Sequence, residues 1–251
     1  GITFLKPRGD SKNVGFHKKN MTNNVVKSVV SSEVEAKIFN ELGYNDFELM
    51  KTGMPKFDNA ELAPNANKIT YMPTWRPWEE SAVVNGDIKK TTYYQSMVEV
   101  IQAFEQAGLL DRLQIAAHNK FAHYAKDLFK DYADLFVEDP TDTLKNSVIY
   151  ITDISSIIFD AINHGAFPIF YWKEFDDIIA KHGGTTPANR DNVPGVVADD
   201  EHELVALVQK AINTNCHLPE KVRHNYRQIN EFNDNRNTER VIQELKNDKV
   251  L

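Results

Sequence analysis

The sequence predicts an α/β protein in which helices cover a parallel β-sheet. Apolar stretches with strand character alternate along the chain with stretches of helical period, which is typical of βαβ units. Small polar turns join strands to helices, and the most informative is Thr152-Asp153-Ile154-Ser155-Ser156. A chain of 251 residues, with 41% hydrophobic and 26% charged residues, has the composition of a globular protein with one large or two smaller domains.

Strands and helices can be assigned in order from apolar runs and helix signals. Strands are expected at residues 2–5, 25–30, 47–52, 68–72, 113–117, 135–138, 148–152 and 168–171. A first helix is expected after Ser32, which has capping-box spacing to Glu35, and Gly43 supplies its stop signal. Later helices are expected at the apolar stripe of Tyr94, Met97, Val98, Ile101 and Phe104, closed by Gly108, and at Arg236–Leu245.

A linker is expected between residues 55 and 67, which are rich in Pro, Asn, Asp and Ala and lack an apolar period. It divides the chain into residues 1–60, which are too few for a complete doubly wound domain, and residues 66–251, which can fold alone. The front piece therefore resembles the tail of a larger domain.

Charge and cysteine content exclude several classes of protein. A net charge of -7 argues against nucleic-acid binding, and the single Cys216 excludes an intramolecular disulfide and a cysteine zinc cluster. The longest apolar run is far short of the ~20 residues of a spanning helix, and no signal peptide opens the chain, so a cytoplasmic location is expected. The first thirty residues are basic, which suits either an anionic substrate or membrane surface, or a solvated loop face.

The turn from Thr152 to Ser156 is the first candidate site. It gathers two hydroxyls, unpaired backbone N–H groups and the positive end of a helix dipole, and such a turn can bind phosphate. Plain helix capping by Asp153 or Ser155 is the structural alternative.

Two further candidates follow other strands. Arg76, in the loop Pro73-Thr74-Trp75-Arg76, could clamp a phosphate, or it could stack on a neighbouring tryptophan or pair with Glu79 or Glu80. His118 ends the strand at 113–117 and could donate to a phosphate or leaving group, or it could be a capping or core histidine.

Other familiar sites are missing from the sequence. The histidines lack the i, i+4 spacing of a metal pair on one helix face, so no protein metal site is expected. G-x-S-x-G, Walker A and G-x-G-x-x-G motifs are also absent.

These motifs together resemble the C-terminal half of the CDP-glycerol glycerophosphotransferase family, the teichoic acid polymerases and primases. The family's "PTWR" loop, strand-terminal histidine and "ITDYSS" followed by "FD" resemble Pro73–Arg76, His118 and Ile151–Asp160. Its "TG-x-P-R-x-D" and "GPVV" resemble Thr52–Asp58 and Pro194–Val197. The matches keep their order over nearly the whole chain.

The resemblance implies a GT-B architecture, in which two Rossmann-like domains face a cleft and the C-terminal one holds the donor nucleotide. Such enzymes transfer an alditol phosphate from a CDP-alditol to a hydroxyl of a wall or capsule polymer and release CMP, without a cofactor. The donor phosphates would be held by residues of the three motifs, with His118 as the catalytic histidine: Thr74, Arg76, Thr152, Asp153, Ser155, Ser156 and Asp160. Glycerol and ribitol donors, and polymerase and primase roles, stay open, and membrane attachment in this family is often peripheral, at the inner face.

The sequence departs from the family pattern in three places. Lys6-Pro7-Arg8-Gly9 stands where the family has a histidine-glycine pair, so Arg8 or Pro7 takes the acceptor-side catalytic position, although a guanidinium cannot act as a base near neutral pH. His17 could supply the base instead if the loop folds back. Ile154 replaces the usual tyrosine, and most of the family's N-terminal domain is missing. A non-catalytic nucleotide-binding module, and a GT-B transferase with another nucleotide-sugar donor, are therefore the alternative functions.

Overall fold

Two compact units make up the part of the chain that the structure, a computed structural model, describes: residues 2–7, 17–20 and 27–249. The first unit contains the described residues up to Ala60, Ile179–Pro194 and the described residues from Pro219 onward. The second contains Glu61–Ile178 and Gly195–Leu218. Each unit is described below by itself.

The second unit is built on a five-stranded sheet, whose strands all run parallel in the order β4-β3-β5-β6-β7. This arrangement confirms the expected α/β class with a parallel sheet. The strands are β3 (Lys68–Tyr71), β4 (Leu113–Ile115), β5 (Ser147–Thr152), β6 (Phe167–Tyr171) and β7 (Val196–Ala198).

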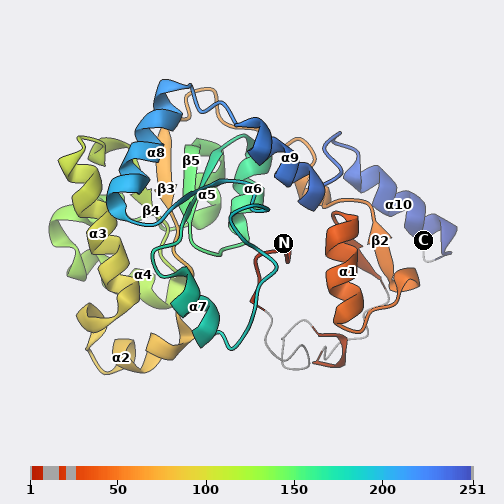
Figure 1. Ribbon diagram of the computed structural model, residues 1–251, viewed down its shortest axis with the longest axis horizontal. Coiled ribbons are helices and arrows are strands. Elements are labelled where there is room, and N and C mark those ends of the chain that lie inside the picture. Colours follow the sequence, from red (N-terminus) through yellow and green to blue (C-terminus); the bar gives the residue numbers. More distant parts are fainter. Residues whose placement is uncertain (1, 8–16, 21–26, 250–251) are drawn as a thin grey trace. The chain divides into compact units, whose positions relative to one another are not determined.

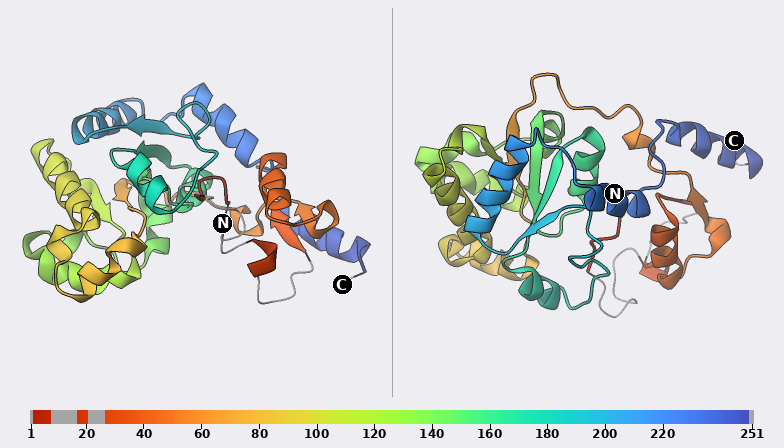
Figure 2. Two further views of the ribbon diagram at one scale, coloured as in Figure 1. Left: turned by 60° about the horizontal axis from the view of Figure 1, so that its bottom comes forward. Right: turned by 45° about the horizontal axis from the view of Figure 1, so that its top comes forward.

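Helices lie on both faces of this sheet (Figures 1 and 2). On one face α3 packs with β4 and α8 packs with β6 and β7, while on the other face α5 and α6 pack against β3, β5 and β6. The helices of the second unit are α2 (Glu80–Val84), α3 (Thr92–Gln106), α4 (Asn119–Leu128), α5 (Pro140–Asn146), α6 (Ile157–His164), α7 (Phe175–Lys181, which crosses the boundary between the units) and α8 (Glu201–Asn213).

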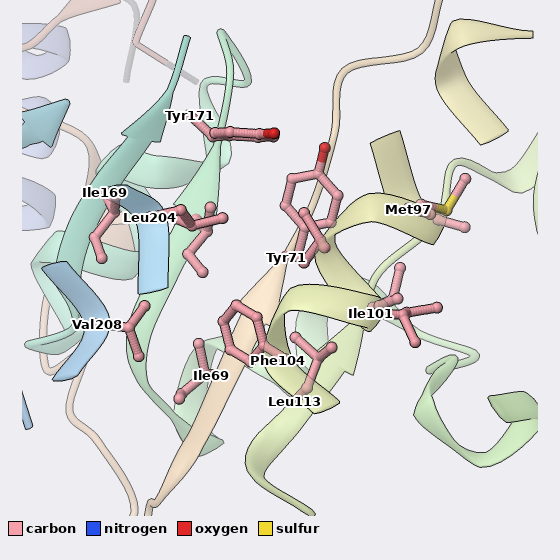
Figure 3. Close-up of a cluster of buried hydrophobic side chains, with 14 of the residues drawn as sticks. Ile69, Tyr71, Met97, Ile101, Phe104, Leu113, Ile169, Tyr171, Leu204 and Val208 are labelled. Carbon is pink, nitrogen blue, oxygen red and sulfur yellow. The ribbon is translucent and has the colours of Figure 1, made fainter. Parts of the chain in front are cut away.

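The core of the second unit lies between the sheet and the α3–α8 layer (Figure 3). Alternate residues of β3, Ile69 and Tyr71, point to this side and are buried, as the period of two along a strand requires. Phe104 of α3 and Leu204 of α8 are fully buried against them. Fixed in this way, the sheet gives the loops that follow its strands a rigid base.

In the first unit, β1 (Ser28–Val30) pairs in parallel with β2 (Leu49–Lys51). The helix α1 (Glu33–Glu41) begins as predicted, because the Ser32 side chain accepts a hydrogen bond from the Glu35 amide. The Glu35 carboxylate is itself buried and accepts hydrogen bonds from the amides of Thr3 and Ser31, each at 2.8 Å. The unit is completed by α9 (Glu220–Ile229) and α10 (Asn237–Asn247).

Three strand assignments differ from those expected. Residues 2–5 form a turn rather than a strand, with Lys6 N–H bonded to the Thr3 carbonyl. Residues 135–138 contribute only an isolated bridge between Phe136 and Ile115, since a short 3-10 helix occupies the chain up to Leu135. The strand β7 was not expected, because its three residues lie between the turn signal Pro194-Gly195 and the acidic Asp199-Asp200, without the longer apolar run that marked the other short strands.

The C-terminal residues also group differently from the expected 66–251 domain. Although the first boundary falls between Ala60 and Glu61, residues from Pro219 onward belong to the first unit. The Asp58 carboxylate explains the docking of α10, because it accepts hydrogen bonds from the amides of Asn237 at 3.0 Å and Thr238 at 2.8 Å. It thus satisfies N–H groups that the first helical turn leaves unpaired.

Replacing Asp58 with alanine is expected to destabilise the protein by about 1 kcal/mol, the usual effect of losing a helix cap. Burial raises the pKa of Asp58, but hydrogen bonds from Thr238 and Asn237 outweigh burial and hold the pKa below its ordinary value. The stabilisation is therefore complete above about pH 4, the unfolded value, and is lost as the pH falls through the folded value. Urea unfolding at pH 7 and pH 3 measures both effects. The exposed Asp127→Ala is the matched control, and equal stability of the two variants at pH 7 would contradict the capping role.

Candidate functional site

The loops that follow β3 and β5 are joined by the Asp153 carboxylate. Asp153 is buried and accepts hydrogen bonds from the Thr74 amide at 3.0 Å, the Thr74 hydroxyl and the Ile154 amide at 2.6 Å. The Thr152 hydroxyl donates to the Met72 carbonyl at 2.6 Å. Because β3 and β5 are parallel neighbours, both loops emerge at the same sheet edge, where α/β proteins bind ligands. Thr74, Thr152 and Asp153 therefore shape this edge through bonds to the protein itself.

The N-terminus of α6 directly follows this junction. Ser156 is its capping residue, and the Ser156 side chain makes no capping hydrogen bond, so the hydroxyl is available to a ligand. Ser155 and Ser156 are half-buried, and their carbonyls accept from the amides of Ile158 and Phe159. Two hydroxyls at a helix N-terminus suit an anion such as phosphate. Asp160 lies in the first turn of the same helix.

Arg76 is buried under the loop after β3, with a 2% exposed side chain. Its guanidinium pairs with the Glu174 carboxylate and donates to the Thr92 hydroxyl. The Arg76 Nε atom is buried and has no hydrogen-bond partner among the described residues. Arg76 thus places a positive charge beneath the sheet edge, instead of reaching out as an exposed clamp.

Glu174 was not identified as a site residue from the sequence, although it lies just after a strand, as the other candidate residues do. Trp172-Lys173-Glu174 directly follow β6, and the ends of parallel strands gather functional side chains. Burial raises the pKa of Glu174, although its ion pair with Arg76 works in the opposite direction. The sequence gives no spacing signal for the pair, because 98 residues separate its members.

A second ion-pair network that the sequence did not reveal surrounds Lys173. The Lys173 ammonium pairs with Glu99 at 3.0 Å and with Glu201, which also accepts a hydrogen bond from the Tyr171 hydroxyl at 2.9 Å. Burial raises the pKa of Glu201, but the bonds from Lys173 and Tyr171 outweigh burial and lower the pKa to about 2. The two carboxylates also line a pocket of about 420 Å³ between α3 and α8, an acidic lining that does not suit a phosphate.

His118 follows β4 and caps α4. Its Nδ1 atom accepts a hydrogen bond from the Lys120 amide at 3.3 Å, and its own backbone N–H donates to the Tyr93 hydroxyl at 2.8 Å. The imidazole stacks on the Trp75 indole, with ring centroids 5.2 Å apart and an interplanar angle of 17°. His118 and the loop after β3 therefore touch through side chains, at the sheet edge already described.

The structure thus gathers most of the expected site residues at the carboxyl edge of one sheet, in the loops after β3, β4 and β5. Arg8 lies outside the described residues. Within the described residues, no group of three or more histidine, cysteine, aspartate or glutamate side chains is arranged to hold a metal ion. None of the described helices has the length and apolar character needed to span a membrane.

Removing the Asp153 carboxylate is expected to separate the two loops. Asp153→Ala leaves the Thr74 and Ile154 amides without their acceptor, and losing hydrogen bonds to a buried charge should cost about 3 kcal/mol of stability. Urea unfolding measures this loss. Thr74→Ser, which keeps the hydroxyl, is the control and should change stability by less than about 1 kcal/mol. An Asp153→Ala protein as stable as the control would show that the carboxylate does not hold the loops.

Solved structures of the wall teichoic acid polymerase TagF are similar to this chain. A histidine-to-asparagine variant matches with a TM-score of 0.66 and 16% identity, over 89% of this chain and 58% of the TagF chain. The same variant soaked with CDPG matches with a TM-score of 0.66 and 15% identity, over the same shares of the two chains. This likeness confirms the GT-B fold type, and the chain spans less than two thirds of the length of TagF. Among curated proteins, none matches the sequence.

A model of a protein family matches almost the whole sequence. The family is described as CDP-glycerol:poly(glycerophosphate) glycerophosphotransferase, and the match covers residues 5–247. The motifs quoted from the sequence, the parallel sheet and the loops at its carboxyl edge agree with this match. The chain therefore belongs to the CDP-glycerol:poly(glycerophosphate) glycerophosphotransferase family.

Proposed function

We propose that this chain carries the donor-binding part of a transferase that moves glycerol phosphate or ribitol phosphate from a CDP-alditol to a hydroxyl of a wall or capsule polymer. The observation that carries the proposal is the α6 N-terminus, where Ser155 and Ser156 lie beside a loop junction fixed by Asp153. Hydroxyls, helix amides and a buried arginine are the groups that bind a pyrophosphate without a metal. Family membership supports CDP-glycerol as the donor class.

The proposed reaction is a displacement at phosphorus. The acceptor oxygen forms a bond to the phosphorus that carries the alditol, and the bond from that phosphorus to the bridging oxygen breaks. CMP leaves with the bonding electrons, and the acceptor hydroxyl proton passes to a base on the acceptor side. Negative charge grows on the departing CMP, so fixed donors near the pyrophosphate lower the barrier.

Each site residue has a role in this proposal. Ser155, Ser156 and the α6 amides hold the pyrophosphate, and His118 donates a hydrogen bond to it. Arg76, paired with Glu174, supplies positive potential from below the loop. Hydrogen bonds of Thr74, Thr152 and Asp153 hold the loops after β3 and β5 together. Asp160 orients a hydroxyl of the donor.

Roles on the acceptor side rest on the sequence. Arg8 stands at the family's histidine position and would meet the polymer acceptor, whose phosphates suit the basic residues near it. The same region would provide any peripheral contact with the inner face of the membrane. Liposome co-sedimentation with anionic vesicles tests that contact.

The Arg8 position also favours a second candidate function, a nucleotide-binding module without catalysis. A guanidinium does not accept a proton near neutral pH, so a chain that relies on Arg8 would bind the donor without turning it over. Release of CMP in the presence of donor and acceptor distinguishes the two functions. A nucleotide-sugar donor is distinguished by thermal shift, because a ligand at 100 times its Kd stabilises the protein by about 2.7 kcal/mol.

Replacing both serines is expected to weaken donor binding. Each hydroxyl that donates to a phosphate oxygen contributes about 1.4 kcal/mol, so Ser155→Ala with Ser156→Ala should raise the Kd for CDP-glycerol by about 100-fold. Isothermal titration calorimetry measures the change, and Ser81→Ala, an exposed serine of α2, is the control. If the folded wild-type chain binds neither CDP-glycerol nor CDP-ribitol, the proposed donor class is wrong.

A further inference from the structure

His118 is held by more contacts with neighbouring side chains than hydrogen bonding to a ligand requires. Its imidazole lies nearly parallel to the Trp75 indole, and Trp75 in turn meets the Tyr93 ring edge-on, with centroids 5.3 Å apart. Tyr93 is fully buried and packs on Phe121 of α4, with centroids 5.1 Å apart. Backbone and ring of His118 are therefore held from two sides, since the Tyr93 hydroxyl also accepts the His118 N–H.

The hydrogen bond at Nδ1 determines the position of the proton. Because the Lys120 amide donates to Nδ1, that nitrogen must present its lone pair. A neutral imidazole then carries its proton on Nε2. No described residue bonds to Nε2, so the Nε2–H group is free to donate to a ligand.

The surroundings also favour the neutral ring. Burial lowers the pKa of His118, the Lys120 ammonium lowers the pKa further, and the Glu80 carboxylate raises it. The titratable groups that face the ring are Glu80 of α2, Lys120 of α4 and the phenol of Tyr93 of α3. Glu80 and Lys120 pair with each other at 2.7 Å, so their opposite effects largely cancel. What remains is the effect of burial, and the stacked Trp75 indole covers one face of the ring.

We propose that Trp75 is a positioning residue, which holds His118 as a neutral imidazole that donates Nε2–H to the anionic group of the ligand. The proposal rests on the proposed function for the identity of that ligand, the pyrophosphate of a CDP-alditol. In this tautomer His118 has no free lone pair, so it cannot remove a proton from the acceptor. A neutral imidazole also binds the phosphate of the product less tightly than a charged imidazolium would, because charge-assisted hydrogen bonds are stronger.

Selective ¹⁵N labelling of histidine and NMR titration test the proposal on the full chain without ligand. The wild-type protein should show the His118 signals of the neutral Nε2–H tautomer at pH 7, with half-protonation below the ordinary pH of about 6.5. Trp75→Ala admits water to the ring and should move half-protonation up toward 6.5. Trp75→Phe keeps an aromatic face and should keep the wild-type titration.

Two further variants distinguish the effect of the Trp75 stack on the His118 titration from the effects of the neighbouring charges. Lys120→Met keeps the backbone amide, so the tautomer should persist while half-protonation moves up. Glu80→Gln removes a carboxylate and should move half-protonation down. A charged or Nδ1–H imidazole in the wild-type protein at pH 7 would overturn the proposal, as would equal titrations of Trp75→Ala and Trp75→Phe.

Donor binding gives a separate measurement. Titration with CDP-glycerol should show about tenfold weaker binding for Trp75→Ala and near wild-type binding for Trp75→Phe. If wild-type protein shows the Nε2–H tautomer but binds no CDP-alditol, the proposed function fails while the imidazole state stands. If wild-type protein binds the donor and His118 is charged, the positioning role fails alone. Should Trp75→Ala not fold, the wild-type spectrum and the Trp75→Phe titration still decide.

Discussion

The candidate site depends on one buried carboxylate. The Asp153 carboxylate accepts hydrogen bonds from the amides of Thr74 and Ile154. It therefore fixes the relative positions of two loops whose residues Thr74 and Asp153 are 79 apart in sequence. A buried carboxylate that lost these donors would be strongly destabilising, which makes the geometry hard to change. The other groups of the candidate site lie on these two loops or contact them: the hydroxyls at the start of α6, the arginine of the loop after β3 and the histidine stacked on Trp75. The parallel sheet brings the two loops to the same edge, and the Asp153 hydrogen bonds fix the loops relative to each other.

The fold was predictable where sequence period and turn chemistry agree. The strand at 148–152 and the helix after Ser156 were recognised together, because an apolar run ends at a polar turn and a helical pattern begins behind it. Short or isolated segments were not recoverable in this way. β7 lies between Pro194-Gly195 and Asp199-Asp200, with no longer apolar run around it. The turn at residues 2–5 is as apolar as a strand, but the Thr3 amide bonds to the buried Glu35 carboxylate instead of to a neighbouring strand. The membership of α10 depends on Asp58, a partner far away in the chain.

For the candidate site, the sequence predicted which loops follow neighbouring strands better than it predicted the partner of each side chain. The residues Thr74, Thr152 and Asp153 were expected to bind phosphate, yet the structure engages them in bonds to the protein. Arg76 was expected to clamp phosphate, to stack on a neighbouring tryptophan or to pair with Glu79 or Glu80. Its partner is instead Glu174, on the loop after β6. The stacking of Trp75 on His118 likewise joins the loops after two different strands. Contacts of this kind depend on which strands are neighbours in the sheet. The hydrophobic period within one segment does not reveal that order.

The division of the chain into units bears on its synthesis. Neither unit is a continuous stretch of sequence, because the first is completed by Ile179–Pro194 and by the residues from Pro219 onward, and the second by Gly195–Leu218. Domains generally fold as units while the chain leaves the ribosome, the N-terminal part first. Here the sheet of the second unit lacks its edge strand β7 and its covering helix α8 until those segments emerge. The first unit must wait still longer, since the helix that Asp58 caps follows both of those segments in the sequence. A ribosome that stalls between Ile179 and Gly195 would thus hold two incomplete cores, each with exposed apolar surface.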